Sequence, residues 1–261
     1  MTYTRLPLWR LYKPAKEEAY RRAVGYWPFV GWLTGGIMAL VLWLGLEGLS
    51  LGVAVVLVIL SRILVTGAFH EDGLADFTDG MGGGRGREDS LRIMKDSHIG
   101  TYGVLALIVY ILTLYLCLRE LTMAFGLRSL QSTSPCHNPI LMTAAAILTC
   151  DVWGKCLASL LPVALPYARR EEEAKLRLTY LRPKWGWQAV RIVGALLPVG
   201  LLWWRIGIVP PIAVICTPVV VVALLSLWLR HRIGGYTGDC CGASFLLSEL
   251  SMYLVWNICV S

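Results

Sequence analysis

Asp72, Asp76 and Asp79 are the residues whose type and spacing best suit chemistry. They lie four and then three positions apart, so on a helix of about 3.6 residues per turn they fall within an arc of about 60°. Three like charges on one stripe repel each other unless a cation neutralises them. Carboxylate oxygens at this spacing suit Mg²⁺ or Mn²⁺. We therefore predict a metal site on this stripe, with a solvated acidic helix as the alternative.

The residues that follow the stripe are of the types that bind phosphate. A glycine run permits close approach of the backbone to a ligand, and basic side chains neutralise phosphate oxygens. Phosphoryl transfer needs carboxylates, a divalent metal and basic residues, because its catalysis is mainly positioning and charge neutralisation. The run lacks the GK[ST] ending of a P-loop. For substrate binding we assign Gly83, Gly84, Arg85 and Arg92, and for catalysis Asp76, Asp79, Lys95 and Asp96, the last also as a metal ligand.

Two polar residues outside this run are assigned to the same site. His70 stands two positions before Asp72 and is a candidate proton acceptor or metal ligand, while a hydrogen-bonding histidine at the membrane interface fits equally well. Asp239 lies in the polar stretch GGYTGD and is assigned to substrate binding, with a helix-start aspartate as the alternative. Asp239 can serve this site only if the fold brings it to the stripe.

We interpret three of the charged residues that fall inside apolar runs. A carboxylate in hydrocarbon needs a partner or a polar cavity, and on this ground Glu249 is assigned to substrate binding. Asp151 and Lys155 are spaced i, i+4, which places them side by side on one helix. We interpret that pair as structural, with each charge neutralising the other.

Apolar helices must position all of these residues. The chain has 261 residues, of which 56% are hydrophobic and 16% charged, with a mean hydropathy of +0.61. This is too little polar surface to coat a water-soluble globule. The apolar runs approach the roughly 20 residues that a helix needs to cross a bilayer. We predict one integral-membrane domain over residues 1–261, an all-α polytopic bundle of about seven spans at 28–46, 49–68, 101–118, 138–163, 187–204, 207–229 and 241–259.

The distribution of Lys and Arg predicts the topology, because cytoplasmic loops accumulate positive charge. Eighteen basic residues fall in the N-terminal segment and alternate loops, and three in the loops between. The N-terminus is then cytoplasmic, and so are a catalytic loop at 70–100 and a second polar loop at 230–240. Residues 1–25 lack a cleavable signal pattern and are expected on the membrane surface. We assign the net charge of +7 to anionic lipid and phosphorylated substrates, not to nucleic acid.

Two long sequences, HEDGLADFTDGMGGGRGRE at 70–88 and LRIMKDSHIGTYGVLAL at 91–107, resemble the signature of the cobalamin synthase (adenosylcobinamide-GDP ribazoletransferase) family. Four shorter matches fit in the same order, TRLP at 4–7, YWPFVG at 26–31, LPYAR at 165–169 and GGYTGD at 234–239, so the resemblance covers nearly the whole chain. The matched positions are His70, Asp72, Gly73, Asp76, Asp79, Gly80, Lys95, Asp96, Gly100, Gly238 and Asp239.

This resemblance implies a multi-pass enzyme of the cell inner membrane that uses Mg²⁺. Members join adenosylcobinamide-GDP to α-ribazole, or to its 5′-phosphate, and release GMP. The implied partners are these substrates and membrane lipid, and the sequence is compatible with an oligomer. The chain departs from the usual family residue at Glu71 (usually Leu), Gly86 (acidic), His98 (Arg), Lys155 (Arg), Phe245 (Asn) and Leu246 (Glu). The departures concern substrate orientation, whereas the aspartate set is intact.

The mechanistic hypothesis places Mg²⁺ on the aspartates, against the pyrophosphate of the activated corrinoid. Lys95 and Arg85 then take up charge as GMP leaves, while a carboxylate or His70 accepts the proton of the ribazole hydroxyl. One alternative is a CDP-alcohol phosphotransferase of phospholipid synthesis, but the second half of its longer aspartate pattern is absent after Gly80. The other is a cation-coupled transporter, whose polar site should lie near the membrane midplane, not at the end of a span.

Overall fold

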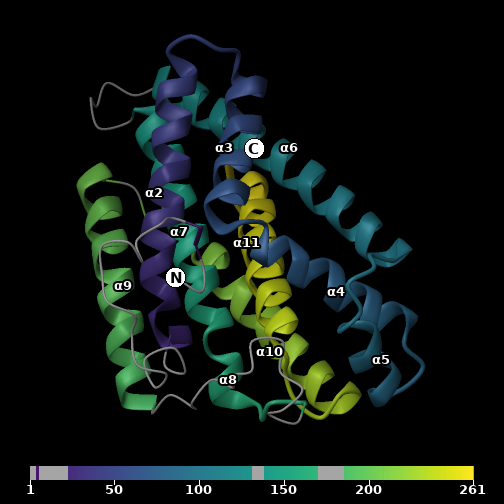
Figure 1. The fold of residues 1–261 in the computed structure, drawn as a ribbon. Helices are drawn as coiled ribbons and strands as arrows, with labels where there is room; N and C mark the ends of the chain where they lie inside the picture. The colour runs from purple at the N-terminus through teal and green to yellow at the C-terminus, as the bar shows by residue number, and fades with distance from the viewer. Residues whose placement is uncertain (1–3, 6–22, 131–137, 170–184, 208, 261) are drawn as a thin grey trace.

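The computed structural model describes residues 4–5, 23–130, 138–169, 185–207 and 209–260, and the regular elements within these ranges are helices (Figure 1). This confirms the predicted all-α bundle. The long helices are α2 (Trp27–Leu46), α3 (Leu51–Thr66), α4 (Phe69–Gly83), α6 (Thr101–Leu130), α7 (Pro139–Ala158), α9 (Trp185–Ile206), α10 (Ile212–Arg232) and α11 (Gly238–Val260). The short ones are η2 (Ala23–Tyr26), α5 (Arg87–Ile93) and α8 (Leu161–Ala164).

Within the described ranges, six helical segments are long and apolar enough to cross a membrane, and α3 with α4 forms a seventh, bent candidate. The predicted spans match these helices to within about five residues, with two exceptions. The span 49–68 corresponds to α3 alone, which is a candidate only together with α4, and the span 101–118 is too short because α6 continues to Leu130. The prediction stopped at the charges of Arg119 and Glu120, which bond to each other on an exposed face of α6. Leu121 and Phe125 of the same helix are buried, so packing continues past them.

Helices α7 and α11 form the centre of the bundle. In their most apolar windows, 72% and 56% of the residues are buried, against 22–33% in the other four unbent candidate spans. Helix α4 packs tightly on α11, since a β-carbon at Gly73 would lie 3.2 Å from the carbonyl oxygen of Asp239 and 3.4 Å from the Cα of Gly242. Glycine at this crossing therefore lets the acidic helix approach the central helix closely.

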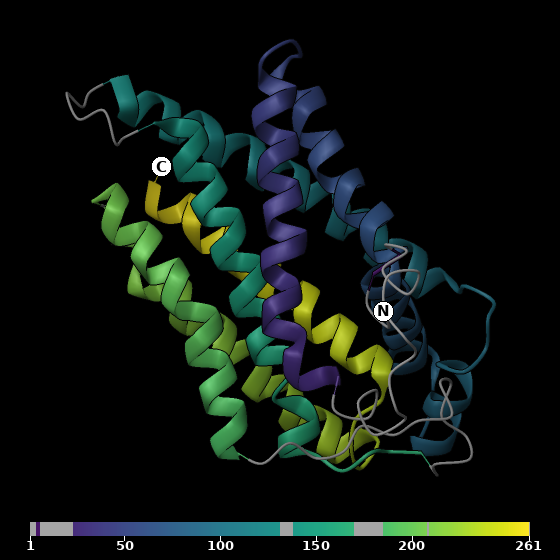
Figure 2. The same ribbon diagram turned by 60° about the vertical axis from the view of Figure 1, so that its left-hand side comes forward.

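The chain turns by 87° between α3 and α4. Gly67 and Ala68 both adopt left-handed backbone conformations, with φ of 67° and 58°. Glycine does so without steric cost, whereas for alanine the conformation costs about 1–2 kcal/mol. The N–H of Ala68 donates to the carbonyl of Ile63 (2.9 Å) and so closes the end of α3. The turn carries α4 away from the axis of α3, toward the end of the bundle that holds α5 and α8 (Figures 1 and 2).

Three polar segments meet at this end, which is here called the polar end: the α4–α5 segment, residues 165–169 and residues 232–239. The Arg87 guanidinium donates to the carbonyls of Ile233 (3.0 Å) and Ala168 (2.7 Å). Arg232 donates to the carbonyl of Gly84. The segments 70–100 and 230–240, which were predicted on one side of the membrane, thus contact each other, and 70–100 is mostly helix and not an open loop. The cytoplasmic side stays a prediction, and most of segment 1–25 lies outside the described residues.

Candidate active site

Asp72 and Asp76 lie one turn apart on α4, as the spacing predicts. The Asp72 side chain is exposed and Asp76 is half-buried. Within the described residues, no three His, Cys, Asp or Glu side chains converge as a metal-binding group. Mg²⁺ is nevertheless commonly held by one or two carboxylates together with substrate phosphates and water. Asp72 and Asp76 are the two carboxylates of the stripe that such a site could use, since neither is fully buried.

Asp79, the third member of the stripe, points into the protein. Its two carboxylate oxygens accept the backbone N–H groups of Gly100 (2.7 Å) and Gly103 (2.9 Å) at the start of α6. A carboxylate here satisfies donors that lack an intrahelical partner, and it suits the positive end of the helix dipole. A β-carbon at Gly100 would lie 2.4 Å from Asp79 Oδ1, so glycine is required for this contact. Asp79 therefore anchors α6 to α4 in this structure.

Lys95 and Asp96 follow α5 and are exposed. Asp96 accepts hydrogen bonds from the backbone N–H of His98 (3.0 Å) and from its Nδ1 (2.7 Å). These bonds, the side-chain one first, lower the pKa of Asp96. The structure places Asp96 in this turn and does not bring it into a metal-binding group with the described aspartates of α4.

The substrate-binding candidates of the glycine run have different surroundings. Gly83 is exposed, whereas Gly84 is buried and a β-carbon there would lie 2.3 Å from Ser90 Oγ. Arg92 donates to Asp89 Oδ1 (2.5 Å), and the backbone N–H of Arg85 donates to Asp89 Oδ2 (3.1 Å). The bond from Arg92 is the main cause that lowers the pKa of Asp89. Both guanidinium groups are exposed at the polar end and can meet an anion from solution.

Asp239 is buried at the first turn of α11, beside α4. Its Oδ2 accepts from the Thr237 hydroxyl (3.3 Å) and lies 3.8 Å from Nη2 of Arg169. Arg169 also donates to the carbonyl of Leu91 (3.2 Å), and its Nε has no hydrogen-bond partner among the described residues. Sequence reasoning did not assign Arg169 to the site; its place in the LPYAR match was the available signal. The fold brings this buried guanidinium to Asp239.

His70, a candidate proton acceptor or metal ligand by sequence, lies inside the bundle. The ring is fully buried and packs on Trp27, Phe69 and Phe245, with centroid distances of 5.6, 5.6 and 4.7 Å. Neither ring nitrogen has a hydrogen-bond partner among the described residues. Two positions correspond to about 200° around a helix, so His70 faces the bundle while Asp72 faces outward. This makes His70 poorly placed as a surface base.

The structure gives Glu249 a protein partner. Its carboxylate accepts two bonds from Nη1 of Arg62 (2.7 and 2.5 Å) and one from the hydroxyl of Tyr110 (2.7 Å). Glu71 also contacts Arg62 at 3.3 Å. Glu249 is fully buried and, in this structure, takes part in internal packing, whereas it was expected to bind substrate. A charged residue in an apolar span was the signal that Arg62 needed such partners.

The structural pair predicted at Asp151 and Lys155 is confirmed. The Lys155 ammonium donates to Asp151 Oδ1 and to the Thr34 hydroxyl (3.0 Å), and it lies 4.0 Å from the centroid of the Phe245 ring. All of these contacts are inside the bundle. The interior charges therefore connect helices to one another.

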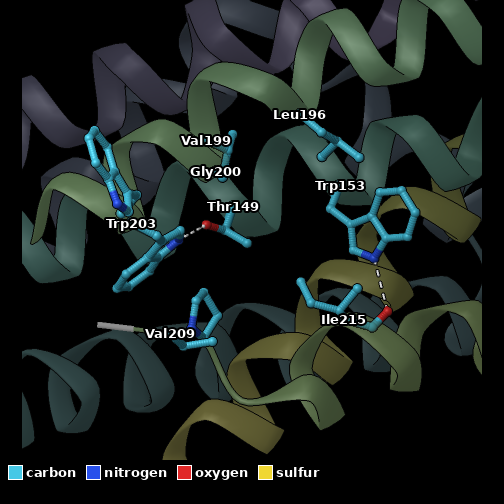
Figure 3. Close-up of a pocket in the computed structure, with 10 residues that line it drawn as sticks. Thr149, Trp153, Leu196, Val199, Gly200, Trp203, Val209 and Ile215 are labelled. Atoms are coloured by element: carbon cyan, nitrogen blue, oxygen red, sulfur yellow. Dashed lines mark hydrogen bonds between the residues drawn. The ribbon is translucent and has the colours of Figure 1, made fainter. Parts of the chain in front are cut away.

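A cavity of about 390 Å³ opens among α7, α9 and α10 (Figure 3). Its lining is almost wholly apolar, and its two clearest polar contacts are already made: Trp203 Nε1 donates to Thr149 Oγ1 (2.8 Å), and Trp153 Nε1 to the carbonyl of Ile215 (3.0 Å). The lining contains no charged side chain. It cannot neutralise a pyrophosphate, so the polar end is the candidate active site.

Fold and site together define a multi-pass membrane protein in which carboxylates and guanidinium groups gather at one end of a helical bundle. A family model described as cobalamin-5-phosphate synthase matches residues 1–257. The adenosylcobinamide-GDP ribazoletransferase of Leptothrix cholodnii is 36% identical, over 97% of this chain and 91% of its own length. Proteins of the same name from Shewanella oneidensis (34% identical; 97% and 89%) and Vibrio cholerae (36%; 93% and 85%) are also similar.

The chain belongs to the cobalamin-5-phosphate synthase family and is a membrane transferase. The family resemblance drawn from the motifs is thus confirmed. No solved structure is significantly similar to the chain.

Proposed function

We propose that this protein joins adenosylcobinamide-GDP to α-ribazole, or to α-ribazole 5′-phosphate, at the polar end of the bundle in the cell inner membrane. The observation that carries the proposal is the presentation of Asp72 and Asp76 on a helix that packs beside Asp239 and Arg169. The names of the similar proteins support the choice of substrates. Asp72 and Asp76, called the acidic pair below, supply negative charge for a metal ion, and the guanidinium groups supply positive charge for a pyrophosphate.

In the proposed reaction the ribazole hydroxyl oxygen attacks the phosphorus that is esterified to the cobinamide. A phosphorus–oxygen bond forms to the ribazole, and the bond to the bridging oxygen of the pyrophosphate breaks. GMP leaves with that oxygen, and the hydroxyl proton passes to a carboxylate of the polar end. Arg85, Arg92 and Lys95 are exposed there, and they draw in the anionic substrate and offset the charge of the leaving group.

The proposed cofactor is Mg²⁺, or Mn²⁺ in its place, bound by Asp72 and Asp76 with oxygens of the substrate. When bound, the ion neutralises charge on the transferring phosphate. Asp79 would contribute indirectly, because it holds the start of α6 against α4. Asp239 would remain near Arg169 and orient it toward the same end.

The test is incubation of the purified protein with adenosylcobinamide-GDP and Mg²⁺, with α-ribazole and its 5′-phosphate in separate reactions and GMP followed by chromatography. We expect GMP with one acceptor or both, none without acceptor, and loss of turnover with EDTA that either cation restores. Absence of GMP from both acceptors would refute the proposal. Release of CMP from CDP-diacylglycerol and an alcohol would instead support the phospholipid-synthesis alternative.

The side of the membrane is tested with Glu88→Cys, because Glu88 is exposed on α5. Reactive native thiols are first removed from the protein. An impermeant thiol reagent should label this variant after cell lysis and leave it unlabelled in intact cells. Labelling from outside would place the polar end on the other side of the membrane.

A further inference from the structure

The guanidinium of Arg62 joins four helices at the bend between α3 and α4. It lies in the last part of α3 and is fully buried. Its Nη1 donates to both carboxylate oxygens of Glu249 on α11, and its Nη2 donates to the hydroxyl of Tyr110 on α6 (2.7 Å). The same Nη2 donates to Glu71 on α4 (3.3 Å). These four residues are called the Arg62 cluster below.

The cluster is closed, because its members also bond to each other. The Tyr110 hydroxyl accepts from Arg62 and donates to Glu249 Oε2 (2.7 Å), which itself accepts from Arg62. Arginine presents its donors in a rigid planar fork. Once Tyr110 and Glu249 hold that plane, the direction toward Glu71 is fixed as well. The contacts of Arg62 with α6 and α11 therefore fix the orientation of the first turn of α4.

The bend needs such support. Only two residues, Gly67 and Ala68, separate α3 from α4, and Ala68 holds the left-handed conformation that disfavours a residue with a side chain. Strained backbone persists only where surrounding contacts enforce it. Arg62 and Glu71 stand on either side of these two residues, so their ion pair bridges the bend.

We propose that Arg62 is a positioning residue: it fixes the angle of α4 against the bundle by holding Glu71, and thereby sets where Asp72 and Asp76 are presented. Glu71 immediately precedes Asp72, so a rotation or tilt of the first turn of α4 moves Asp72 directly. Gly73, packed on α11, acts as the pivot of this movement. The consequence for metal binding rests on the proposed function. The ion pair between Arg62 and Glu71 that holds the bend, called the clamp below, does not.

The clamp is tested by a distance measurement that requires no activity. Spin labels are attached to Val56→Cys, on an exposed position of α3, and to Glu88→Cys on α5, which packs on α4. The native thiols of Cys136, Cys216 and Cys259 are replaced by serine. We expect one narrow distance distribution in the otherwise unaltered protein.

Glu71→Gln should broaden or shift that distribution, because it removes the charge that bridges the bend and leaves the Arg62–Glu249 pair intact. Arg62→Met should broaden it further. Trp203→Phe is the matched control, since it also removes a buried hydrogen bond between helices, at the cavity wall in Figure 3, and should leave the distribution unchanged. A distribution for Glu71→Gln identical to that of the control would overturn the proposal, even if Arg62→Met fails to fold.

A kinetic measurement then tests the effect on the acidic pair. Groups that orient metal ligands typically alter metal affinity or activity 10–100-fold when removed. Glu71→Gln should accordingly raise the Mg²⁺ concentration for half-maximal GMP release about tenfold, with a smaller change in the rate at saturating Mg²⁺. An unchanged Mg²⁺ requirement would overturn the presentation role. If the unaltered protein releases no GMP, the proposed function fails, and the distance measurement still decides on the clamp.

Discussion

The charges at the polar end and those inside the bundle use the same residue types for different purposes. Inside, Arg62 with Glu249 and Lys155 with Asp151 are fully buried and joined to each other. A buried charge without its partner is strongly unfavourable. The Arg62–Glu249 pair therefore joins α3 to α11, and Lys155, paired with Asp151 within α7, reaches α2 through its bond to Thr34. At the polar end Asp72 and Arg92 are exposed. Exposed charges contribute little to stability and remain accessible to a ligand.

The acidic stripe contains both kinds of charge, because Asp79 is buried whereas Asp72 and Asp76 are not fully buried. Asp79 shares a helix face with Asp72 and Asp76 by sequence spacing, yet its carboxylate is used by α6. Charge pattern alone does not separate a ligand-binding carboxylate from a structural one. Burial and the nearest donors make that distinction. Each prediction below tests one side of the comparison.

The largest effect is expected at Asp72 and Asp76. Asp72→Asn and Asp76→Asn keep the shape of the side chain and remove one anionic ligand, so each should lower GMP release by roughly a hundredfold or more. Both variants should insert and unfold like the unaltered protein. The double variant should be little slower than the slower single one, because the two residues serve one site. Near-normal rates at saturating Mg²⁺ would move the metal site elsewhere.

A comparison of a buried with an exposed ion pair should give the largest difference in stability. Lys155→Met leaves the Asp151 carboxylate without its cation in the bundle and should destabilise the protein by about 3–5 kcal/mol. Arg92→Gln breaks a pair whose side chains are 71% and 36% exposed and should change stability by less than about 1 kcal/mol. Thermal unfolding of the purified proteins measures both. Equal losses would show that burial does not separate these charges.

Asp79→Ala should give an intermediate effect of a different kind. Loss of a side chain that caps a helix start typically costs about 0.5–2 kcal/mol, and the Gly100 and Gly103 N–H groups lose their acceptor. We expect hydrogen exchange at the start of α6 to accelerate while the rest of the bundle stays protected. If Asp79→Ala abolished GMP release and left α6 equally protected, Asp79 would belong with the ligands.

The smallest effect is expected for His98→Arg, which introduces the commoner family residue at an exposed position. The new guanidinium can still donate to Asp96, so GMP release should change less than about twofold, since surface pairs contribute little. Hydrogen bonds from His98 lower the pKa of Asp96 below its ordinary 3.8. Their stabilising contribution is therefore present above that value and is lost as the pH falls through the lowered pKa. A pH titration of Asp96 by NMR should give a similar lowered pKa in the variant.

The sequence alone was sufficient for features that depend on local periodicity. Runs of apolar residues predicted the spans, because crossing hydrocarbon requires a minimum helix length. The spacing of Asp72 and Asp76 predicted one helix face, and the i, i+4 spacing predicted the Asp151–Lys155 pair. The family motifs likewise lie in continuous stretches of the chain. Each of these signals lies within one helix or one short segment.

The tertiary structure decided every contact between residues far apart in the chain. Arg62 meets Glu249 across 187 positions, and Arg169 reaches Asp239 from the segment before α9. No local period encodes such pairs. The burial of His70 and the hydrogen bonds of Asp79 could not be derived from spacing for the same reason: their environments depend on α11 and α6, which pack on α4 only in the folded bundle. Hydropathy and spacing determine where helices form, but the direction in which each charge points depends on which helices come together.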